Sequence, residues 1–385
     1  MPQMVALLNG FGGGASLAIA LTSYLDIISA QTSMGPMLIV SQVAIVLTLI
    51  IGGVTLSGSG IALAKLQEWL PGKPLGFTGI KYLNLLLVIA ALAMGYNLFD
   101  TDTSLAFVAI LVALVLVLGV TLVLPIGGAD MPVVIALLNS YSGIAAAAAG
   151  FIMGNTVLIV SGALVGASGI ILTQIMCVAM NRSLVNVLFG TMVPASGEVI
   201  DSDEVYAGKV KTSCPEEVAM ILDSANRVVI VPGFGLAMAQ AQHAVRELAD
   251  ALIEQSIEVE YAIHPVAGRM PGHMNVLLAE AEVDYELMKT MDEANPSFEQ
   301  TDVVIVIGAN DVTNPMARED KGSPIYGMPI LNVDKAKTVI VVKRSLSPGF
   351  AGLPNPLFAN DNTLMLFGDG KKAIQELTVS VKEAA

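Results

Sequence analysis

A glycine-rich turn after an apolar run is the part of this sequence best suited to chemistry. The β-branched segment 227–232 leads into Gly233-Phe-Gly235-Leu-Ala-Met238. Glycines between a strand and a helix let a pyrophosphate approach the backbone amides of the helix N-terminus. The pattern alone is weak, since its third small position is Met238. A strand predicted before it and a helix predicted after it favour a dinucleotide site.

The ends of two later predicted strands indicate which dinucleotide binds. The strand at 258–263 ends in His264-Pro265, where an NAD site usually carries an acid for the ribose hydroxyl. Lys343-Arg344-Ser345 ends another strand and suits a 2′-phosphate through charge-assisted hydrogen bonds. A solvated basic pair is the alternative, but the position at a strand end favours NADP(H).

Three further loops hold glycines and polar residues that suit a cofactor. They span 266–273, 308–315 and 347–352, and the last resembles a lid. Arg269 suits either a phosphate or an acid of its own domain. Asp311 is either a turn former or a carboxylate whose pKa depends on a bound cofactor.

Alternating strand and helix signals position these loops. Strands are predicted at 227–232, 258–263, 302–307, 329–333, 338–343 and 364–367. Helices are predicted at 236–255, 273–281, about 284–292 and 371–380. The alternation predicts a Rossmann-like α/β domain over 226–385, a doubly wound parallel sheet with ligands at the carboxyl ends of its strands. A linker with a short helix near 215–224 is expected over 183–225.

The first half of the chain predicts a membrane bundle. Mean hydropathy is +0.72 over 385 residues, and residues 1–180 hold only eight charged side chains. Six apolar stretches are long enough to cross about 30 Å of hydrocarbon. They lie near 4–23, 37–64, 82–99, 104–124, 132–152 and 156–180 and define a domain over 1–182. The net charge of −14 argues against nucleic acid as a partner.

An internal repeat relates the first two of these stretches to the last two. Val5-Ala-Leu-Leu-Asn9 matches Ile135-Ala-Leu-Leu-Asn139 at an offset of 130 residues, so that the two copies point the same way. Asn9 and Asn139 suit either helix packing or a transport path. Asp130 suits a helix cap or a channel mouth, and Arg182 an interfacial anchor or an ion pair.

Loop charges predict the orientation in the membrane. Lys65, Lys73, Lys81 and Arg182 fall on one side, and no base falls on the other. The positive-inside rule then places both termini and the α/β domain in the cytoplasm.

Taken together, these segments resemble the β subunit of proton-translocating NAD(P) transhydrogenase over nearly the whole chain. The block from His264 to Ala281 is the most specific. The other motifs that carry the resemblance are Gly127-Gly-Ala-Asp-Met-Pro, Leu138-Asn-Ser-Tyr-Ser-Gly, Met180-Asn-Arg, Gly308-Ala-Asn-Asp, Lys343-Arg-Ser and Asn355-Pro-Leu-Phe.

The resemblance implies direct hydride transfer between NAD(H) on a partner α subunit and NADP(H) on this chain, without flavin or metal. It implies that proton movement across the membrane drives NADPH formation. The implied partners are an α subunit, which brings the NAD-binding domain and further membrane helices, and membrane lipid. The implied assembly is a dimer of αβ units in the bacterial cytoplasmic (inner) membrane.

The resemblance also implies roles for residues. Asp311 is the implied link between proton occupancy and cofactor binding, and the implied proton path is Asn9, Asp130, Asn139 and Arg182. The implied cofactor-binding positions are Gly233, Phe234, Gly235, Leu236, Ala237, Met238, Ala239, Val266, Ala267, Gly268, Arg269, Met270, Pro271, Gly272, Gly308, Ala309, Asn310, Asp311, Val312, Gly327, Met328, Lys343, Arg344, Ser345, Gly349, Phe350, Ala351, Gly352, Asp369 and Gly370.

Two features depart from the family pattern. Many members carry a membrane histidine where this chain has Asn9, so that a proton relay must use Asn9, Asn139 and waters, or a group of the partner subunit. Typical members also have three helices before the first one here. We expect a truncated or wrongly assigned N-terminus, or a partner chain that supplies those helices.

Two readings from other classes compete with the resemblance. One is a channel or transporter gated by a regulatory nucleotide domain, against which the sequence shows no filter-like segment. The other is a soluble-type NADP reductase with a membrane anchor. Six predicted helices with an internal repeat are more than an anchor needs.

Overall fold

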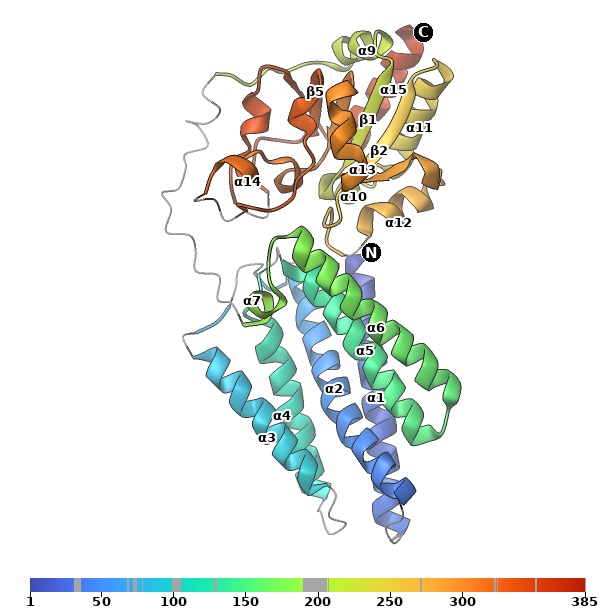
Figure 1. Cartoon of the computed structure of the whole chain (residues 1–385), viewed down its shortest axis with the longest axis vertical. Coiled ribbons are helices and arrows are strands. Elements are labelled where there is room, and N and C mark those ends of the chain that lie inside the picture. The colour runs from blue at the N-terminus through green and yellow to red at the C-terminus, as the bar shows by residue number, and fades with distance from the viewer. Residues whose placement is uncertain are drawn as a thin grey trace. The chain divides into compact units, whose positions relative to one another are not determined.

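The computed structural model divides the chain into two compact units, and each is described by itself (Figure 1). One comprises Met1–Val178 with Arg182–Met192, and the other Ala179–Asn181 with Val193–Ala385. The structure describes residues 1–30, 36–67, 69–71, 75–77, 79–98, 105–127, 130–189, 206, 208–270, 272–321, 323, 325–349 and 352–384.

The first unit is built from long apolar helices. They are α1 (Pro2–Ala30), α2 (Pro36–Leu66), α3 (Ile80–Asn97), α4 (Leu105–Val123), α5 (Met131–Met153) and α6 (Thr156–Ala179), followed by the short α7 (Leu184–Phe189). Six of them are long and apolar enough to cross a membrane, which confirms the six predicted stretches. The protein is therefore an integral membrane protein.

Glycines set the closest helix crossings of this unit. A Cβ at Gly13 would lie 2.8 Å from the carbonyl oxygen of Gly52, and a Cβ at Gly143 would lie 2.9 Å from that of Gly162. Gly13 and Gly143 are 130 residues apart, the offset of the sequence repeat. The α1–α2 and α5–α6 hairpins thus share a backbone-to-backbone crossing, as expected where lipid offers no hydrophobic drive for helix association.

The second unit is a parallel sheet of six strands in the order β3-β2-β1-β4-β5-β6. The strands are β1 (Arg227–Pro232), β2 (Glu258–Ile263), β3 (Met288–Thr290), β4 (Val303–Ile307), β5 (Thr338–Lys343) and β6 (Thr363–Phe367). The chain runs outward from β1 to β3, returns to β4 beside β1, and then runs outward to β6. This is the doubly wound order, and it confirms the predicted Rossmann-like fold.

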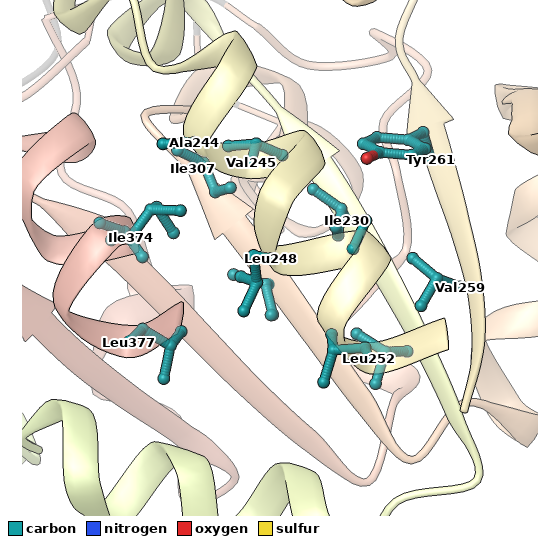
Figure 2. Close-up of a cluster of buried hydrophobic side chains, with 14 of the residues drawn as sticks. Ile230, Ala244, Val245, Leu248, Leu252, Val259, Tyr261, Ile307, Ile374 and Leu377 are labelled. Atoms are coloured by element: carbon teal, nitrogen blue, oxygen red, sulfur yellow. The ribbon is translucent and has the colours of Figure 1, made fainter. Parts of the chain in front are cut away.

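Alternate strand residues point to two separate apolar layers. Val228 and Ile230 of β1 belong to a layer covered by α9 (Pro215–Asp223), α11 (Gln242–Glu254), α12 (His273–Glu280) and α15 (Gly370–Ala384). Figure 2 shows Leu248 and Leu252 of α11 in this layer, with Ile374 and Leu377 of α15 beside them. Because both faces of the sheet are buried, the sequences of the strands are continuous apolar runs.

Short helices and loops cover the opposite face of the sheet. Val229 and Val231 pack there with Phe298, Leu331 and Phe358. The short elements of this face are α13 (Met291–Ala294), α14 (Met316–Glu319) and the 3₁₀ turns η2 (Tyr285–Leu287), η3 (Asn295–Gln300), η4 (Asp311–Thr313), η5 (Val333–Lys335) and η6 (Pro356–Ala359).

The strand predicted at 329–333 is wrong. Leu331 is buried, which explains the apolar signal, but its amide donates to the carbonyl of Val312 at 2.9 Å. The amide of Asn332 donates to the Asn295 side chain at 2.9 Å. Since β4 and β6 already pair with both edges of β5, this segment has no free strand edge there and its amides bond to loops instead.

Two predicted helices are also wrong in extent. The one at about 284–292 is a 3₁₀ turn, the edge strand β3 and the start of α13, because Met288 pairs with Tyr261 of β2. The one at 236–255 is two helices, α10 (Phe234–Ala239) and α11. Gln240 separates them in the left-handed conformation, with φ 48°.

Candidate functional site

The turns after β1 and β4 meet backbone to backbone where the strand order reverses. The amide of Gly233 donates to the carbonyl of Ile307, and that of Gly235 to Gly308, both at 2.9 Å. A Cβ at Gly235 would lie 2.6 Å from the Cα of Gly308, which itself has φ +64°. Ala309 lies against Gly233 in the same way. A crevice between diverging crossovers is where ligands bind in doubly wound sheets.

The helix that starts at this turn presents its first residues in different directions. Leu236 is buried in the layer beneath α11, and Ala237 and Ala239 pack at its margin. Met238 occupies a position where the fingerprint has a small residue. Its side chain is 60% exposed, so the larger residue fits without a clash. Gly370 lies near this helix, since a Cβ there would be 3.3 Å from that of Ala239.

The loop after β2 reaches the glycine turn through an arginine. The guanidinium carbon of Arg269 lies 4.1 Å from the ring centroid of Phe234. A cation–π contact holds the guanidinium in place and leaves N–H donors of the group available for other partners. Ala267 and Met270 are buried, Val266 is half-buried, and Gly268 and Gly272 have positive φ. Pro271 lies outside the described residues.

His264 anchors the start of this loop as a neutral imidazole. Its Nε2 lies 2.8 Å from the carbonyl oxygen of Pro329, and its Nδ1 accepts from the amide of Val266 at 3.2 Å. Burial lowers the pKa of His264 to about 4. The ring is thus a structural bridge at neutral pH.

The basic turn after β5 brings the ammonium of Lys343 close to two serine residues. The Nζ of Lys343 donates to the carbonyl of Ser347 at 2.7 Å and lies 4.7 Å from the ring centroid of Phe358. Burial lowers the pKa of Lys343 to about 8, and the charge of Asp311 opposes that shift. The hydroxyls of Ser345 and Ser347 are 2.9 Å apart. A phosphate oxygen would replace neutral partners with charge-assisted bonds.

Arg344 extends this turn toward the last helix. Its Nη2 lies 3.2 Å from Oδ2 of Asp369, and both side chains are largely exposed. Asp369 also accepts from the amide of Lys371 at 3.2 Å, at the start of α15. Exposed pairs of this kind contribute little to stability, so that Arg344 can exchange Asp369 for a ligand at low cost.

Asp311, in the loop after β4, lies against the loop after β5. Asn310 Nδ2 donates to Asp311 Oδ1 at 3.3 Å. A Cβ at Gly349 would lie 2.7 Å from the same carboxylate oxygen, so the backbone of the predicted lid passes directly over this side chain. Gly352 follows with φ +70°, and Phe350 and Ala351 lie outside the described residues.

Three further predicted positions, Val312, Gly327 and Met328, lie in or next to the loop after β4. Val312 is buried, and its carbonyl accepts from Leu331. Gly327 has φ +78° and donates to the carbonyl of Ala317 at 2.8 Å. Met328 packs against the apolar layer under this loop.

Two residues that the sequence did not assign join the site. Asn355 is fully buried and donates through Nδ2 to the carbonyl oxygen of Asn310 at 3.1 Å. Its backbone amide donates to the hydroxyl of Tyr206 at 2.9 Å. The Asn-Pro-Leu-Phe motif was a signal for Asn355, whereas an isolated tyrosine in a polar segment gave none for Tyr206.

The polar residues singled out in the first unit make specific contacts. Arg182 Nη1 lies 3.3 Å from Oδ2 of Asp130, whose side chain is 4% exposed. Asp130 stands at the N-terminus of α5 without a side-chain cap bond. Asn9 is buried and donates to the carbonyl of Ile135 at 3.3 Å, which joins α1 to α5. Asn139 is half-buried on α5.

Strand order, glycine contact and membrane helices together define a class: integral membrane proteins that carry a Rossmann-like α/β domain. A profile described as NAD(P) transhydrogenase beta subunit matches residues 1–380. The chain belongs to this family, as its sequence resemblance implies. Membership implies NADP binding and an α subunit as partner.

Curated relatives agree with the profile. The chain is 49% identical over 378 residues to "NAD(P) transhydrogenase subunit beta" of Rhodospirillum rubrum, a match that covers 98% of this chain and 81% of the relative. The same figures hold for a protein of that name from a designated strain of the species. Among the described residues, no group of three or more His, Cys, Asp or Glu side chains suits a metal ion.

Proposed function

We propose that the second unit binds NADP(H) across the carboxyl ends of β1, β4 and β5. One observation carries this proposal. The glycine contact after β1 and β4 and the basic turn after β5 all lie at the carboxyl ends of neighbouring parallel strands. The pyrophosphate would lie at Gly233–Ala239 and the 2′-phosphate at Lys343, Arg344 and Ser345. The adenosine end would therefore lie toward β5, which agrees with the missing acid after β2.

The reaction that this arrangement supports is hydride transfer between two bound nicotinamides. NADH on the α subunit would pass hydride from its ring to that of NADP⁺, which leaves NAD⁺ and NADPH with no flavin or metal between them. Arg269 on Phe234 would orient the cofactor near the turn, and the lid over Asp311 would exclude water.

Proton movement would be coupled to this site through Asp130, Arg182, Asn9 and Asn139 in the membrane and Asp311 in the sheet domain. The domain would face the cytoplasm of a bacterium, in agreement with the charges of its loops. Coupling requires a proton to change the relative affinity for NADP⁺ and NADPH, typically by about 1–3 kcal/mol. The carboxylate of Asp311 is suited to this because the lid backbone and Lys343 both lie close to it.

The experiment is a transhydrogenation assay in vesicles that hold this chain with its α subunit. Reduction of NADP⁺ by NADH should rise when a proton gradient is imposed, and Asp311→Asn should change NADPH release while the domain stays folded. Proton flux that is gated by nucleotide but needs no NAD(H) would support the gated-transporter reading instead. Unchanged release rate and pH dependence in Asp311→Asn would refute the role of this carboxylate.

A further inference from the structure

Tyr206 is a buried aromatic residue that touches the cofactor site through Asn355 and has no part in the cofactor binding proposed above. It precedes β1 in the chain, yet only 7% of its surface is exposed. Its ring stacks on that of Phe358, with centroids 6.3 Å apart and planes at 22°. Its hydroxyl oxygen accepts the backbone amide of Asn355 at 2.9 Å. One side chain therefore fixes both ends of the short segment 355–358.

The first end of that segment leads to Asp311. Asn355 Nδ2 donates to the backbone and side-chain oxygens of Asn310, at 3.1 and 3.4 Å. Asn310 in turn donates to the Asp311 carboxylate at 3.3 Å. Asn355 is held in place because its Oδ1 accepts from the amide of Leu357 at 3.1 Å. A partly buried chain of hydrogen bonds with every step filled transmits orientation.

The second end leads to Lys343. Phe358 is fully buried, and the ammonium nitrogen of Lys343 lies 4.7 Å from its ring centroid. The ring of Tyr206 supports this aromatic face through its stacking contact. The same tyrosine is thus linked to two groups. One is the carboxylate of Asp311, which is expected to sense protons, and the other is the ammonium of Lys343, which is expected to hold the 2′-phosphate.

We propose that Tyr206 and Asn355 are positioning residues through which the segment before β1 sets the affinity of the site for NADP(H). Tyr206 orients Asp311 by way of Asn355 and Asn310, and orients Lys343 by way of Phe358. Loss of the Tyr206 contacts would release both groups together, so that one side chain affects the carboxylate and the cation at once. This inference rests on the proposed NADP(H) site.

The test uses the full chain in detergent, with NADPH as ligand and pH varied from 6.5 to 8.5. Tyr206→Phe keeps the stacked ring and removes only the hydroxyl. We expect a change in NADPH affinity of about 2- to 10-fold, the usual range for one hydrogen bond, and a displaced pH profile. Asn355→Asp should move the profile further and toward higher pH, because a second carboxylate would lie near Asp311.

Tyr285→Phe is the matched control, since Tyr285 is 70% exposed and lies before the edge strand β3. It should leave affinity and pH profile unchanged. If Tyr206→Phe and Asn355→Asp only lower the melting temperature, with affinity and profile as in the wild type, Tyr206 is a packing residue and the inference is overturned. A wild-type chain that binds no NADPH would instead refute the proposed function. If Asn355→Asp does not fold, the result for Tyr206→Phe decides.

Discussion

The membrane bundle and the sheet domain both bring backbones together through glycine, but with different consequences. In the bundle, Gly143 and Gly162 let α5 and α6 cross closely, because packing rather than the hydrophobic effect holds helices together in lipid. In the sheet domain, the apolar layers supply that stability. There, Gly235 and Gly308 meet outside those layers, where bare backbone can face a ligand. Glycine therefore permits close helix packing in one unit and, in the other, the close approach of two turns at the proposed binding site.

The largest effect is expected for Gly308→Ala. Its Cβ would lie 2.7 Å from the carbonyl carbon of Gly235, so the turns must separate. Displacement costing about 3 kcal/mol corresponds to a loss of NADPH affinity of more than about 100-fold. Gly208→Ala is the control, because Gly208 has a similar φ of +71° but nothing within 4 Å. It should cost only about 1–2 kcal/mol of stability and leave affinity unchanged. Equal binding losses in the two variants, measured by calorimetry, would contradict this account.

A smaller effect is expected for Gly162→Ala, which should lower the stability of the membrane unit without changing NADPH affinity. Its Cβ would lie 2.7 Å from the carbonyl oxygen of Gly143, so that α5 and α6 must move apart. Overpacking of this type costs about 1–3 kcal/mol. The fluorescence of Trp69, the single tryptophan, reports on the membrane unit. Its unfolding midpoint should fall while NADPH affinity stays constant. Gly60→Ala, on a position of α2 with open space, should change neither.

The smallest effect is a pH dependence that belongs to the sheet domain alone. Burial lowers the pKa of Lys343 to about 8 in the protein without NADPH. A bound 2′-phosphate stabilises the ammonium form, so the complex keeps a proton that the protein without NADPH loses above that pH. The contribution of Lys343 to NADPH affinity should therefore be constant below pH 8 and weaken above it, by at most about 10-fold per pH unit. Lys343→Arg should flatten the profile between pH 7.5 and 9.5. A wild-type profile that is flat over this range would exclude Lys343 as the titrating group.

Much of the fold could be predicted because its signals are local. Six apolar stretches and five of the strands follow from hydropathy and β-branched runs, which tertiary contacts did not override. The break at Gln240 could not be predicted, since alanine, methionine and glutamine all favour a continuous helix. The segment 329–333 has the composition of a strand, but both sides of β5, the strand that follows it, are already paired with β4 and β6.

The candidate site divides in the same way. The positions of Gly233, Gly235 and the basic turn were predictable. Each directly follows a strand, and the carboxyl ends of parallel strands all lie on the same side of the sheet. The contact between Arg269 and Phe234 joins loops that only the fold brings together. Tyr206 could not be predicted, since its position depends on contacts with residues about 150 positions later in the chain.

The central claim is that this chain binds NADP(H) through a 2′-phosphate site after β5, and titration of the full chain with NADPH and NADH tests it most directly. NADPH should bind at least about 100-fold more tightly than NADH, since charge-assisted bonds contribute about 1.5–3 kcal/mol each. Lys343→Ala with Arg344→Ala should abolish that preference. Lys335→Ala with Lys337→Ala, a basic pair before the other end of β5, should leave it intact. Equal binding of NADH and NADPH by the folded wild type would contradict the account.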